Sequence, residues 1–401
     1  MHLVPVLFWI SVFLIFYSYL GYGILVTFLV TVKSLVSRPP KASGDRTPGV
    51  TLVVAAYNEE DSMPAKIRNC LELDYPPDQL RVLFITDGST DGTPGLVRAE
   101  PGLILLHQAA RLGKTAALNR AMQQVETDLV VFSDANTLLN PQAIRNIVRH
   151  YQDPRIGGVA GEKKVIGPQN QTGAGSGEGL YWKYESWLKR MDSALWTVVG
   201  AAGELFSIRT SLFEPLPPGI ILDDFVISLR VAARGYRVAY EPHAFAMETP
   251  SSSIREEQKR KVRISAGGFQ AMILLKGLLL VYRHPVLSFQ YISHRVLRWT
   301  LTPLALPLAL LCNLLLAARN PGPVYVWLLA LQLGFYGVSL TGLYLAGKNI
   351  RNRFLFVPYY FLFMNYSVYL GFFRFLRGRQ TVIWEKAARE NPLPVPPDPN
   401  P

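Results

Sequence analysis

The stretch TLVVAAYNEE, residues 51–60, passes from a short apolar run directly into four residues with polar side chains. The same change occurs in RVLFITDGSTDGT at residues 81–93 and in LVVFSDANT at residues 129–137. Short runs rich in β-branched residues and bounded by turn residues are typical of buried strands. RVAYEP, residues 237–242, predicts a further strand of this kind.

Helix-like stretches separate these strands, at residues 62–73, 114–125 and 141–151. Strands that alternate with helices predict an α/β fold with a parallel sheet. Ligands of such sheets bind at the carboxyl ends of the strands. The polar residues that follow each strand are therefore candidates for a binding or catalytic site.

Hydrophobic residues make up 49% of the 401-residue chain and cluster in four runs without Asp, Glu, Lys or Arg. The runs are residues 3–32, 299–318, 324–347 and 354–373. Each is long enough to cross a membrane, which takes about 20 residues. The first run has no basic start and exceeds the roughly 7–15 apolar residues of a signal peptide, so it predicts a retained anchor.

The net charge of +12 comes from Lys and Arg residues concentrated beside these runs. They include Lys33, Arg38, Lys41, Arg46, the basic residues within 255–263, Lys348, Arg351 and Arg353. This placement suits membrane lipids and not a nucleic acid, which favours one basic face on a soluble domain. The positive-inside rule predicts a multi-pass protein of the inner (plasma) membrane with a cytoplasmic catalytic domain. The two cysteines, Cys70 and Cys312, imply neither a disulfide framework nor a Cys-based metal site.

The changes in composition predict five parts of the chain. These are an N-terminal transmembrane anchor and linker at 1–48, an α/β catalytic domain at 49–253, basic interfacial helices at 254–298, transmembrane helices at 299–376 and a cytoplasmic or disordered tail at 377–401. Three C-terminal spans would leave the basic tail outside, against the positive-inside rule. We therefore expect one of these segments to be re-entrant or interfacial.

Polar residues at the ends of the first two strands predict a nucleotide site. The first strand leads into Tyr57, Asn58 and Glu59, and the second into the loop 87–93, DGSTDGT. Carboxylates and amides there can bond a base and a ribose, and the glycines allow close backbone approach. Taken alone, the loop is equally well explained by the preference of Asp, Gly and Ser for turns.

The third strand ends in Asp134 and continues to Asn136. Side chains two residues apart at a strand end point the same way. Their oxygens can bind Mg²⁺ or Mn²⁺ that is shared with substrate phosphates. The alternative is that Asp134 only caps the next turn.

Asp223 and Asp224 begin a helical pattern that continues to Arg234. Adjacent carboxylates repel each other, which raises the pKa of one of them and suits base catalysis near neutral pH. The alternative is N-capping of the helix by one of the two.

Read together, the motifs resemble the membrane family-2 glycosyltransferases, whose nucleotide-sugar domain has a Rossmann-like GT-A fold and which include cellulose, hyaluronan and poly-N-acetylglucosamine synthases. The motifs are AAYNEE, TDGSTDGT, GKTAALNRAM, FSDANT, GAAGELFSIR, LDDFVISLRVAARGYR and QKRKV, within residues 50–263. The resemblance implies inverting transfer of a hexosyl or N-acetylhexosaminyl group from a nucleotide-sugar, which we expect to be UDP-linked, to a polysaccharide or lipid-linked glycan. It also implies export or secretion partners.

The resemblance also implies roles for the matching residues. On the donor side, the nucleotide would be bordered by Ala55, Tyr57 and Glu59, and Asp87 would contact the uracil or ribose. Lys114 would lie near the diphosphate, and Asp134 would meet the metal and the diphosphate. Asp224, beside Asp223, would be the general base, and the acceptor side would be lined by Gly200, Gly203 and Glu204. Two positions depart from the family pattern. The second metal-binding carboxylate is here Asn136, which offers a carbonyl oxygen with less charge.

The last motif is the clearest departure. Processive members carry Gln-x-x-Arg-Trp, whereas this chain has Gln258, Arg260, Lys261 and then Val262. The cations can still neutralise a departing diphosphate. The missing tryptophan argues against processive synthesis, and contact with lipid headgroups is the alternative for this basic run.

Two other classes of protein compete with a glycosyltransferase. A membrane-anchored nucleotidyltransferase could share the sheet, but it does not predict the Asp-Asp pair followed by Arg-Gly-Tyr at residues 234–236. An inactive subunit of a polysaccharide export complex predicts loss of acidic residues, yet Asp87, Asp134, Asp223 and Asp224 are all present.

Overall fold

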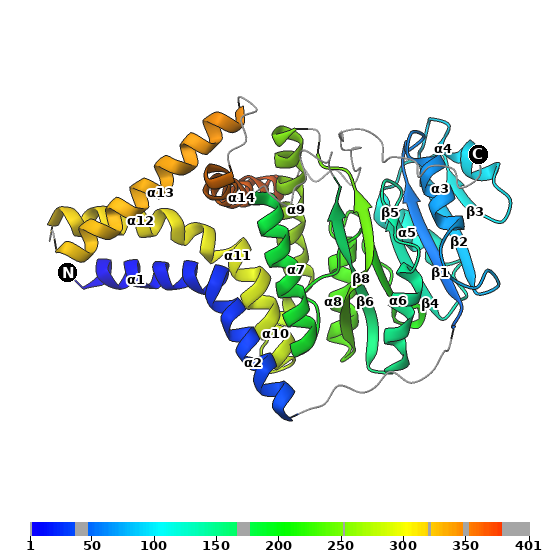
Figure 1. The fold of residues 1–401 in the computed structure, drawn as a ribbon, viewed down its shortest axis with the longest axis horizontal. Helices are drawn as coiled ribbons and strands as arrows, with labels where there is room; N and C mark the ends of the chain where they lie inside the picture. Colours follow the sequence, from blue (N-terminus) through cyan, green and yellow to red (C-terminus); the bar gives the residue numbers. More distant parts are fainter. Residues whose placement is uncertain are drawn as a thin grey trace.

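The computed structural model describes residues 2–36, 47–166, 177–251, 253–319, 322–347 and 353–378. Side chains are not described at 177–180, 347 and 353–354. Several residues discussed above lie outside the described part, namely Arg38, Lys41, Arg46, Lys348, Arg351 and the tail from residue 379. Figure 1 shows a sheet domain at one end of the molecule and long helices projecting from the other.

The described residues form a sheet of eight strands in the order β3-β2-β1-β4-β7-β6-β8-β5. The strands are β1 (Val50–Ala56), β2 (Leu80–Asp87), β3 (Ile104–Gln108), β4 (Leu129–Asp134), β5 (Leu138–Leu139), β6 (Ile156–Val165), β7 (Leu205–Arg209) and β8 (Arg237–Glu248). β1 pairs in parallel with β2 and β4, as predicted, and β2 pairs in parallel with β3, a strand that was not predicted. β7, which was not predicted either, runs antiparallel to both β4 and β6, so the sheet is mixed, whereas β8 pairs in parallel with β6.

The central strand β1 is buried along its whole length because helices cover both faces of the sheet. Val53 pairs in register with Leu83 and Phe132 and faces one core cluster, whereas Leu52 and Phe84 face the other. A strand buried on both faces needs a continuous apolar run and not an alternating one. This is the pattern from which the strand was predicted.

The predicted helices of the α/β domain are confirmed, and others appear. The domain contains α3 (Met63–Leu71), α4 (Thr93–Arg98), α5 (Lys114–Met122), α6 (Ala143–Val148), the 3₁₀ turn η2 (Arg149–Gln152), α7 (Gly177–Leu195) and α8 (Asp223–Ala233). The helix α7 was not predicted. It lies between the sheet and the long apolar helices at the other end of the molecule, which we call the membrane-type helices (Figure 1).

The region predicted as basic interfacial helices, residues 254–298, is helical in the described residues. It contains α9 (Ile254–Leu274), the 3₁₀ turn η5 (Lys276–Leu279), α10 (Pro285–Tyr291), the π-helical turn η6 (Ile292–Val296) and α11 (Leu297–Trp299). Lys261, Ser265 and Ala266 of α9 are buried. α9 is therefore packed inside the protein along much of its length.

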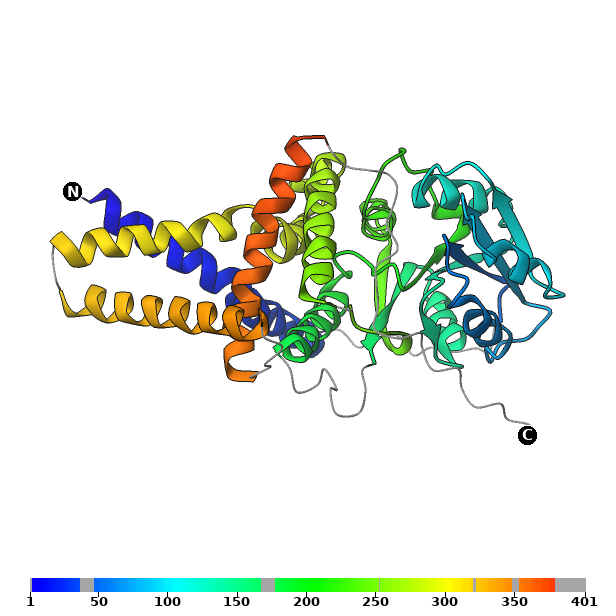
Figure 2. The same cartoon turned by 90° about the horizontal axis from the view of Figure 1, so that it is seen from above.

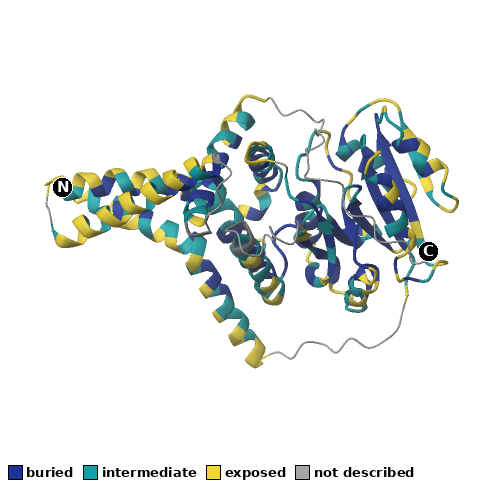
Figure 3. Ribbon diagram, turned by 45° about the horizontal axis from the view of Figure 1, so that its top comes forward, coloured by how far each residue is buried: buried dark blue, intermediate teal, exposed yellow. Residues whose placement is uncertain are grey.

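Three helical stretches in the described residues are long and apolar enough to cross a membrane: Leu3–Val36, Leu301–Arg319 and Pro323–Ala346. The first is a continuous helix made of α1 (Leu3–Phe16), the π-helical turn η1 (Tyr17–Gly21) and α2 (Tyr22–Val36), and the others are α12 (Leu301–Arg319) and α13 (Pro323–Gly347). Large apolar side chains such as Phe13, Leu311 and Trp327 are exposed on them (Figure 3). The chain is therefore a membrane protein.

The fourth predicted span forms α14 (Arg353–Leu376), which is not among these stretches. It runs alongside α9 and across the direction of α12 and α13 (Figure 2). A Cβ added to Gly371 would lie 2.5 Å from the Cβ of Ser265, so the two helices are in close contact. The helix α14 therefore belongs to the catalytic part as much as to the membrane part.

Candidate active site

A cavity of about 740 Å³ lies between the ends of the strands and the membrane-type helices. It collects most of the residues predicted for the site: Ala55, Glu59, Lys114, Asp134, Asn136, Gly200, Gly203, Glu204, Asp223, Asp224, Arg260 and Lys261. These residues come from segments far apart in the sequence, so the predicted motifs converge on one place. Tyr57, Asp87 and Gln258 do not line the cavity.

Lys114 lies at the centre of the acidic part of the cavity. It begins α5, directly after Gly113 with φ 95°, and its Nζ is 2.9 Å from Oδ1 of Asp134 and 3.5 Å from Oδ2 of Asp223. Burial alone would lower the pKa of Lys114, but the carboxylates of Asp134, Asp223 and Asp224 raise it well above its ordinary value. Lys114 is thus a fixed positive charge at neutral pH.

Asp223 and Asp224 occupy the first turn of α8, and Leu222 is the N-cap residue. The alternative, that one of the two aspartates caps the helix, is therefore wrong. Asp223 is only 4% exposed, whereas Asp224 is partly accessible. Burial, with the neighbouring charge of Asp223, raises the pKa of Asp224 to about 7, although Lys114 opposes this rise. The side chain of Asp224 can therefore accept a proton near neutral pH.

The start of α8 is tied to the segment that carries Gly203. Ser228 donates a hydrogen bond to the carbonyl oxygen of Asp224, at 2.8 Å, and accepts one from the backbone N–H of Ala201, at 3.0 Å. A Cβ added to Gly203 would lie 3.4 Å from both Oδ2 of Asp224 and Nζ of Lys114. The absence of a side chain at Gly203 leaves the space in front of both groups open.

Asp134 and Asn136 supply oxygen atoms to the same cavity. Burial raises the pKa of Asp134, and Lys114 partly counteracts this effect. Oδ1 of Asn136 is buried without a hydrogen-bond partner among the described residues. A carboxylate and an unpaired carbonyl oxygen are suitable ligands for a hard divalent cation. No group of three or more His, Cys, Asp or Glu in the described residues could hold a metal, so the protein alone supplies a partial ligand set.

Asp87 and Tyr57 lie beside the cavity. The carboxylate of Asp87 accepts hydrogen bonds from the backbone N–H groups of Leu112 and Gly113, at 3.1 and 2.6 Å. It therefore holds the loop that leads into α5. The guanidinium carbon of Arg111, in the same loop, lies 3.5 Å from the centroid of the Tyr57 ring.

Glu204 is held by a buried lysine that the sequence did not indicate. Nζ of Lys163, on β6, is 2.5 Å from Oε1 of Glu204 and also pairs with Glu248. Burial would raise the pKa of Glu204, but its ion pair with Lys163 outweighs this and lowers the pKa below its ordinary value. Glu204 is therefore ionised at neutral pH.

Some basic residues of α9 line the cavity, and others lie at the surface of the protein. Lys261 is 6% exposed and lines the cavity, with its Nζ 3.5 Å from Oε1 of Glu257. Arg260 also lines the cavity and pairs with Glu257 at 2.8 Å, whereas Lys259 is exposed. Contact with lipid headgroups is therefore wrong for Lys261, and Gln258 does not reach the cavity.

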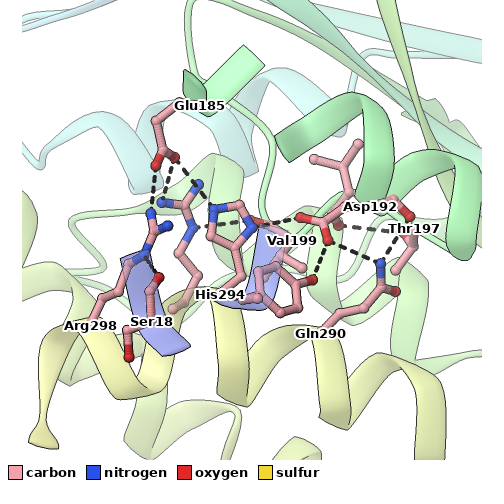
Figure 4. Close-up of polar contacts among 11 residues, drawn as sticks. Ser18, Glu185, Asp192, Thr197, Val199, Gln290, His294 and Arg298 are labelled. Atoms are coloured by element: carbon pink, nitrogen blue, oxygen red, sulfur yellow. Dashed lines mark hydrogen bonds and ion pairs between the residues drawn. The ribbon is translucent and has the colours of Figure 1, made fainter. Parts of the chain in front are cut away.

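Sequence reasoning missed the part of the site that comes from α7, η6 and α11. Glu185 contacts Arg298 at 2.5 Å and Arg295 at 3.3 Å, and Nδ1 of His294 lies 2.6 Å from Oδ2 of Asp192 (Figure 4). The signal for α7 was present, because four polar or aromatic residues and one leucine recur there at the spacing of one helix face. They are Tyr181, Tyr184, Glu185, Leu188 and Asp192.

Trp182, also on α7, faces two cations across the cavity. Its ring centroid lies 5.3 Å from Nζ of Lys261 and 5.5 Å from Nζ of Lys163. Both distances are within the range of cation–π attraction. The cavity therefore contains an aromatic ring although the last motif lacks its tryptophan.

Residues 51–216 match the sequence model of a family described as glycosyl transferase family 2. A poly-beta-1,6-N-acetyl-D-glucosamine synthase of Staphylococcus aureus (strain MSSA476) is 26% identical over 274 residues, which are 65% of this chain and 64% of that protein. The corresponding synthase of Staphylococcus epidermidis is 22% identical over 240 residues, 58% of each chain. The match thus spans less than two thirds of these relatives.

Among solved structures, the fold is similar to that of a mannosyltransferase from Pyrobaculum calidifontis in complex with GDP-Man and Mn²⁺. The TM-score is 0.67 and the sequence identity 24%, and the match covers 93% of this chain and 99% of the other. This similarity identifies the GT-A fold and extends over the membrane-type helices. The chain is thus a membrane protein of GT-A fold, and its residues 51–216 match the family 2 glycosyltransferases.

Proposed function

We propose that the protein transfers a sugar from a nucleotide-sugar to the hydroxyl group of a glycan acceptor at the membrane. The observation that carries this proposal is the arrangement of Lys114 among Asp134, Asp223 and Asp224 in one cavity at the strand ends. The relatives support it, since one is named as a poly-beta-1,6-N-acetyl-D-glucosamine synthase and another as a mannosyltransferase in complex with GDP-Man. A UDP-linked hexosyl or N-acetylhexosaminyl donor remains our prediction.

The reaction is a single displacement that inverts the anomeric carbon. The acceptor oxygen attacks this carbon while its proton passes to Asp224, and the bond from the sugar to the diphosphate breaks. A base with a pKa of about 7 is partly ionised at neutral pH and accepts the proton effectively. Lys114, with Arg260 and Lys261 on α9, stabilises the negative charge of the departing nucleoside diphosphate.

Asp134 and Asn136 would hold a Mg²⁺ or Mn²⁺ ion, with the remaining ligands coming from the diphosphate. Such an ion would supply positive charge that stabilises the leaving group. The unpaired Oδ1 of Asn136 supports this role, because a buried oxygen without a partner is unfavourable unless something binds it. The Mn²⁺ in the mannosyltransferase complex is consistent with it.

Ala55, Glu59, Gly203 and Glu204 all line the cavity. We propose that the nucleotide binds beside Ala55 and Glu59 and the acceptor beside Gly203 and Glu204. We propose that Asp87 acts on the donor through the loop that it holds, since its carboxylate binds Leu112 and Gly113. The ring of Tyr57 would contact the base of the nucleotide once the guanidinium group of Arg111 moves away from that ring.

We also propose an orientation in the membrane. With α1, α12 and α13 as the three spans and α14 at the interface, the catalytic domain and the tail lie on the same side. The basic residues after the anchor, including Lys33, favour the cytoplasm for that side. This arrangement removes the conflict that four spans create and keeps the site within reach of cytoplasmic nucleotide-sugars.

The test is release of nucleoside diphosphate by the purified protein in lipid nanodiscs, with a panel of nucleotide-sugars. We expect one donor to be consumed, and Asp134→Asn or EDTA to abolish the release while the protein stays folded. Full activity in EDTA would exclude the metal. Release of pyrophosphate would indicate a nucleotidyltransferase, and no reaction with any donor would indicate an inactive subunit.

A further inference from the structure

Among the charged residues that line the cavity, four have no part in the proposed transfer and come from elements that carry none of the predicted motifs. They lie on α7, η6 and α11, and are Glu185, Lys189, Arg295 and Arg298. Three of the four are cations. Their position and their bonds indicate what this part of the cavity can bind.

Lys189 is a buried cation whose Nζ makes no hydrogen bond or ion pair with the described residues. It lies one turn after Glu185 on α7 and is 6% exposed. Its Nζ is 6.0 Å from the centroid of the Tyr240 ring, which is at the limit of cation–π attraction. A buried charge is unfavourable unless an opposite charge or hydrogen-bonding groups compensate it. Lys189 is therefore suited to bind an anion that enters the cavity.

Arg295 is held in place but keeps part of its guanidinium group available. Its Nε donates to the carbonyl oxygen of Val199, at 3.4 Å, and its Nη1 lies 3.3 Å from Oε2 of Glu185. Within the described part of the chain Nη2 makes no hydrogen bond. The side chain is 20% exposed and lines the cavity. A ligand in the cavity can therefore accept a hydrogen bond from a guanidinium group whose orientation is already fixed.

The positive charges in this part of the cavity exceed the negative ones. Glu185 is a single carboxylate, and both arginines contact it (Figure 4). Asp192 does not line the cavity and bonds to His294 behind these residues. Three cations, Lys189 and the two arginines, set against two carboxylates leave one positive charge in excess, even with His294 uncharged. An oxyanion supplies the charge that balances it.

This group is connected to the segment that carries the base. Val199, which accepts the hydrogen bond from Arg295, is followed by Gly200, and a Cβ added to Gly200 would lie 2.1 Å from Cδ2 of Phe225. Phe225 follows Asp224 in the first turn of α8. The carboxylates beside Lys114 would repel an oxyanion placed next to them. A negatively charged ligand therefore has its hydroxyl at Asp224 only if its charge lies farther along the cavity.

We propose that Lys189, Arg295 and Arg298 form an oxyanion subsite for the acceptor, and that the acceptor is a negatively charged glycan. Its attacking hydroxyl lies at Asp224, and a carboxylate or phosphate on the same or the next sugar lies at the subsite. This inference rests on the proposed function and narrows its acceptor class. Charge-assisted hydrogen bonds from the two arginines would add affinity and fix the orientation of the sugar.

The first experiment measures binding without the reaction. The purified protein in nanodiscs is titrated calorimetrically with methyl glycosides of glucose, galactose and mannose, with the methyl glycosides of the corresponding uronic acids, and with the 6-phosphates. We expect at least one charged ligand to bind at least tenfold more tightly than its neutral counterpart. The ligand that does so identifies the oxyanion as a carboxylate or a phosphate. Equal affinities throughout, or no binding by any ligand, would overturn the proposal.

Variants separate the subsite from the rest of the cavity. Lys189→Gln should abolish the preference for the charged ligand and should keep the thermal unfolding midpoint, because Lys189 makes no ion pair with the described residues. Arg295→Lys keeps the charge and should retain more of the preference than Arg295→Gln. Arg283→Gln is the matched control, since Arg283 is exposed and does not line the cavity. An equal loss in this control would contradict the proposal.

The same variants show whether the charges serve the acceptor or the donor. The affinities for UDP and GDP should be unchanged in Lys189→Gln and Arg295→Gln. Weaker binding of a nucleoside diphosphate by these variants, with the preference for the charged glycoside intact, would assign the cations to the donor and overturn the proposal.

The second experiment uses the same glycosides as acceptors, with the donor that the panel identifies. We expect Lys189→Gln to raise the KM of the charged acceptor at least tenfold, while the KM of the donor and the slow hydrolysis of the donor without acceptor stay unchanged. Transfer to neutral acceptors alone, with equal KM in both proteins, would exclude a negatively charged acceptor and leave glycosyl transfer intact. If no donor reacts, the proposed function fails, and the calorimetry still decides whether the cavity contains the oxyanion subsite.

Discussion

Among the residues around Lys114, only one aspartate has the properties of a base. Asp134 is bound to Lys114 at 2.9 Å, and Asp223 is almost fully buried. Asp224 is more accessible, and its pKa of about 7 comes from burial and from the charge of Asp223. Asp223 thus raises the pKa of its neighbour and does not need to reach the acceptor itself.

Replacing Asp224 by Asn should lower kcat by about 10²–10⁴-fold, because the side chain keeps its size but loses the oxygen that accepts the proton. Donor affinity, measured by calorimetry, should stay near that of the wild type. Asp223→Asn is the control and should be less damaging. If Asp224→Asn were active and Asp223→Asn inactive, Asp223 and not Asp224 would be the catalytic base.

The rate should also depend on pH in a defined direction. The base must be ionised, so kcat should fall tenfold per unit as pH drops below about 7 and should level off above it. In Asp223→Asn the midpoint should move to lower pH, because the negative charge that raises the pKa of Asp224 is gone. Single-turnover rates between pH 5 and 9 measure this, and an unchanged midpoint would refute the coupling of the two carboxylates.

At the level of helices and strands, sequence reasoning succeeded where local patterns are strong. The strands β1, β2 and β4 are short continuous apolar runs, and they were predicted. β6 contains Gly157, Gly158 and Gly161, which weaken a strand pattern. The structure gives a reason for two of them, since an added Cβ would lie 2.6 Å from Cβ of Tyr236 at Gly157 and 2.8 Å from a carbonyl oxygen at Gly161.

For the site too, the sequence indicated only the residues that lie in strong local patterns. The acidic residues follow strands or begin a helix, so motifs indicated them and the structure brings them together. Glu185, Arg295 and Arg298 come from segments whose contact depends on tertiary packing. No local pattern encodes that contact. The sequence indicated that one apolar segment does not span the membrane but not which one, because an apolar helix that packs on α9 and one that spans a bilayer have similar composition.

The packing of α14 on α9 gives a prediction about stability. Gly371→Ala should destabilise the protein by about 1–3 kcal/mol, because the new Cβ would lie 2.5 Å from Cβ of Ser265 and 2.9 Å from a backbone nitrogen. Gly334→Ala on α13 is the matched control, since nothing lies within 4 Å of its Cβ position. It should be neutral or stabilising, because Ala favours helices. Equal thermal unfolding midpoints for both variants would argue against the close contact.

For the whole molecule, the helices α1, α12 and α13 project together from a catalytic part that α14 closes (Figures 1 and 2). This arrangement makes the location of each end testable. The native Cys70 and Cys312 are buried, so engineered cysteines can be labelled over a low background. Ser43, in the predicted linker, lies outside the described residues.

An impermeant thiol reagent should label Arg319→Cys, at the end of α12, in intact cells. It should not label Arg98→Cys in the catalytic domain or Arg377→Cys after α14, because we place both on the cytoplasmic side. All three positions are exposed in the structure. Labelling of Arg377→Cys in intact cells would make α14 a span, and labelling of Arg98→Cys would reverse the orientation.

The continuous helix from α1 through η1 to α2 makes the enzyme responsive to the bilayer itself. α1 and η1 together have 19 residues, about 28 Å at 1.5 Å per residue, which is close to the thickness of a hydrocarbon core. Below them, Tyr22 bonds to Asp192, and Lys33 donates to the carbonyl oxygens of Ala194 and Leu195. The lower half is thus anchored to α7, while the upper half must tilt when the bilayer thins. The turn that carries Leu20 lies between the two halves and lines the cavity, so we expect a change in membrane thickness to be felt at the cavity wall.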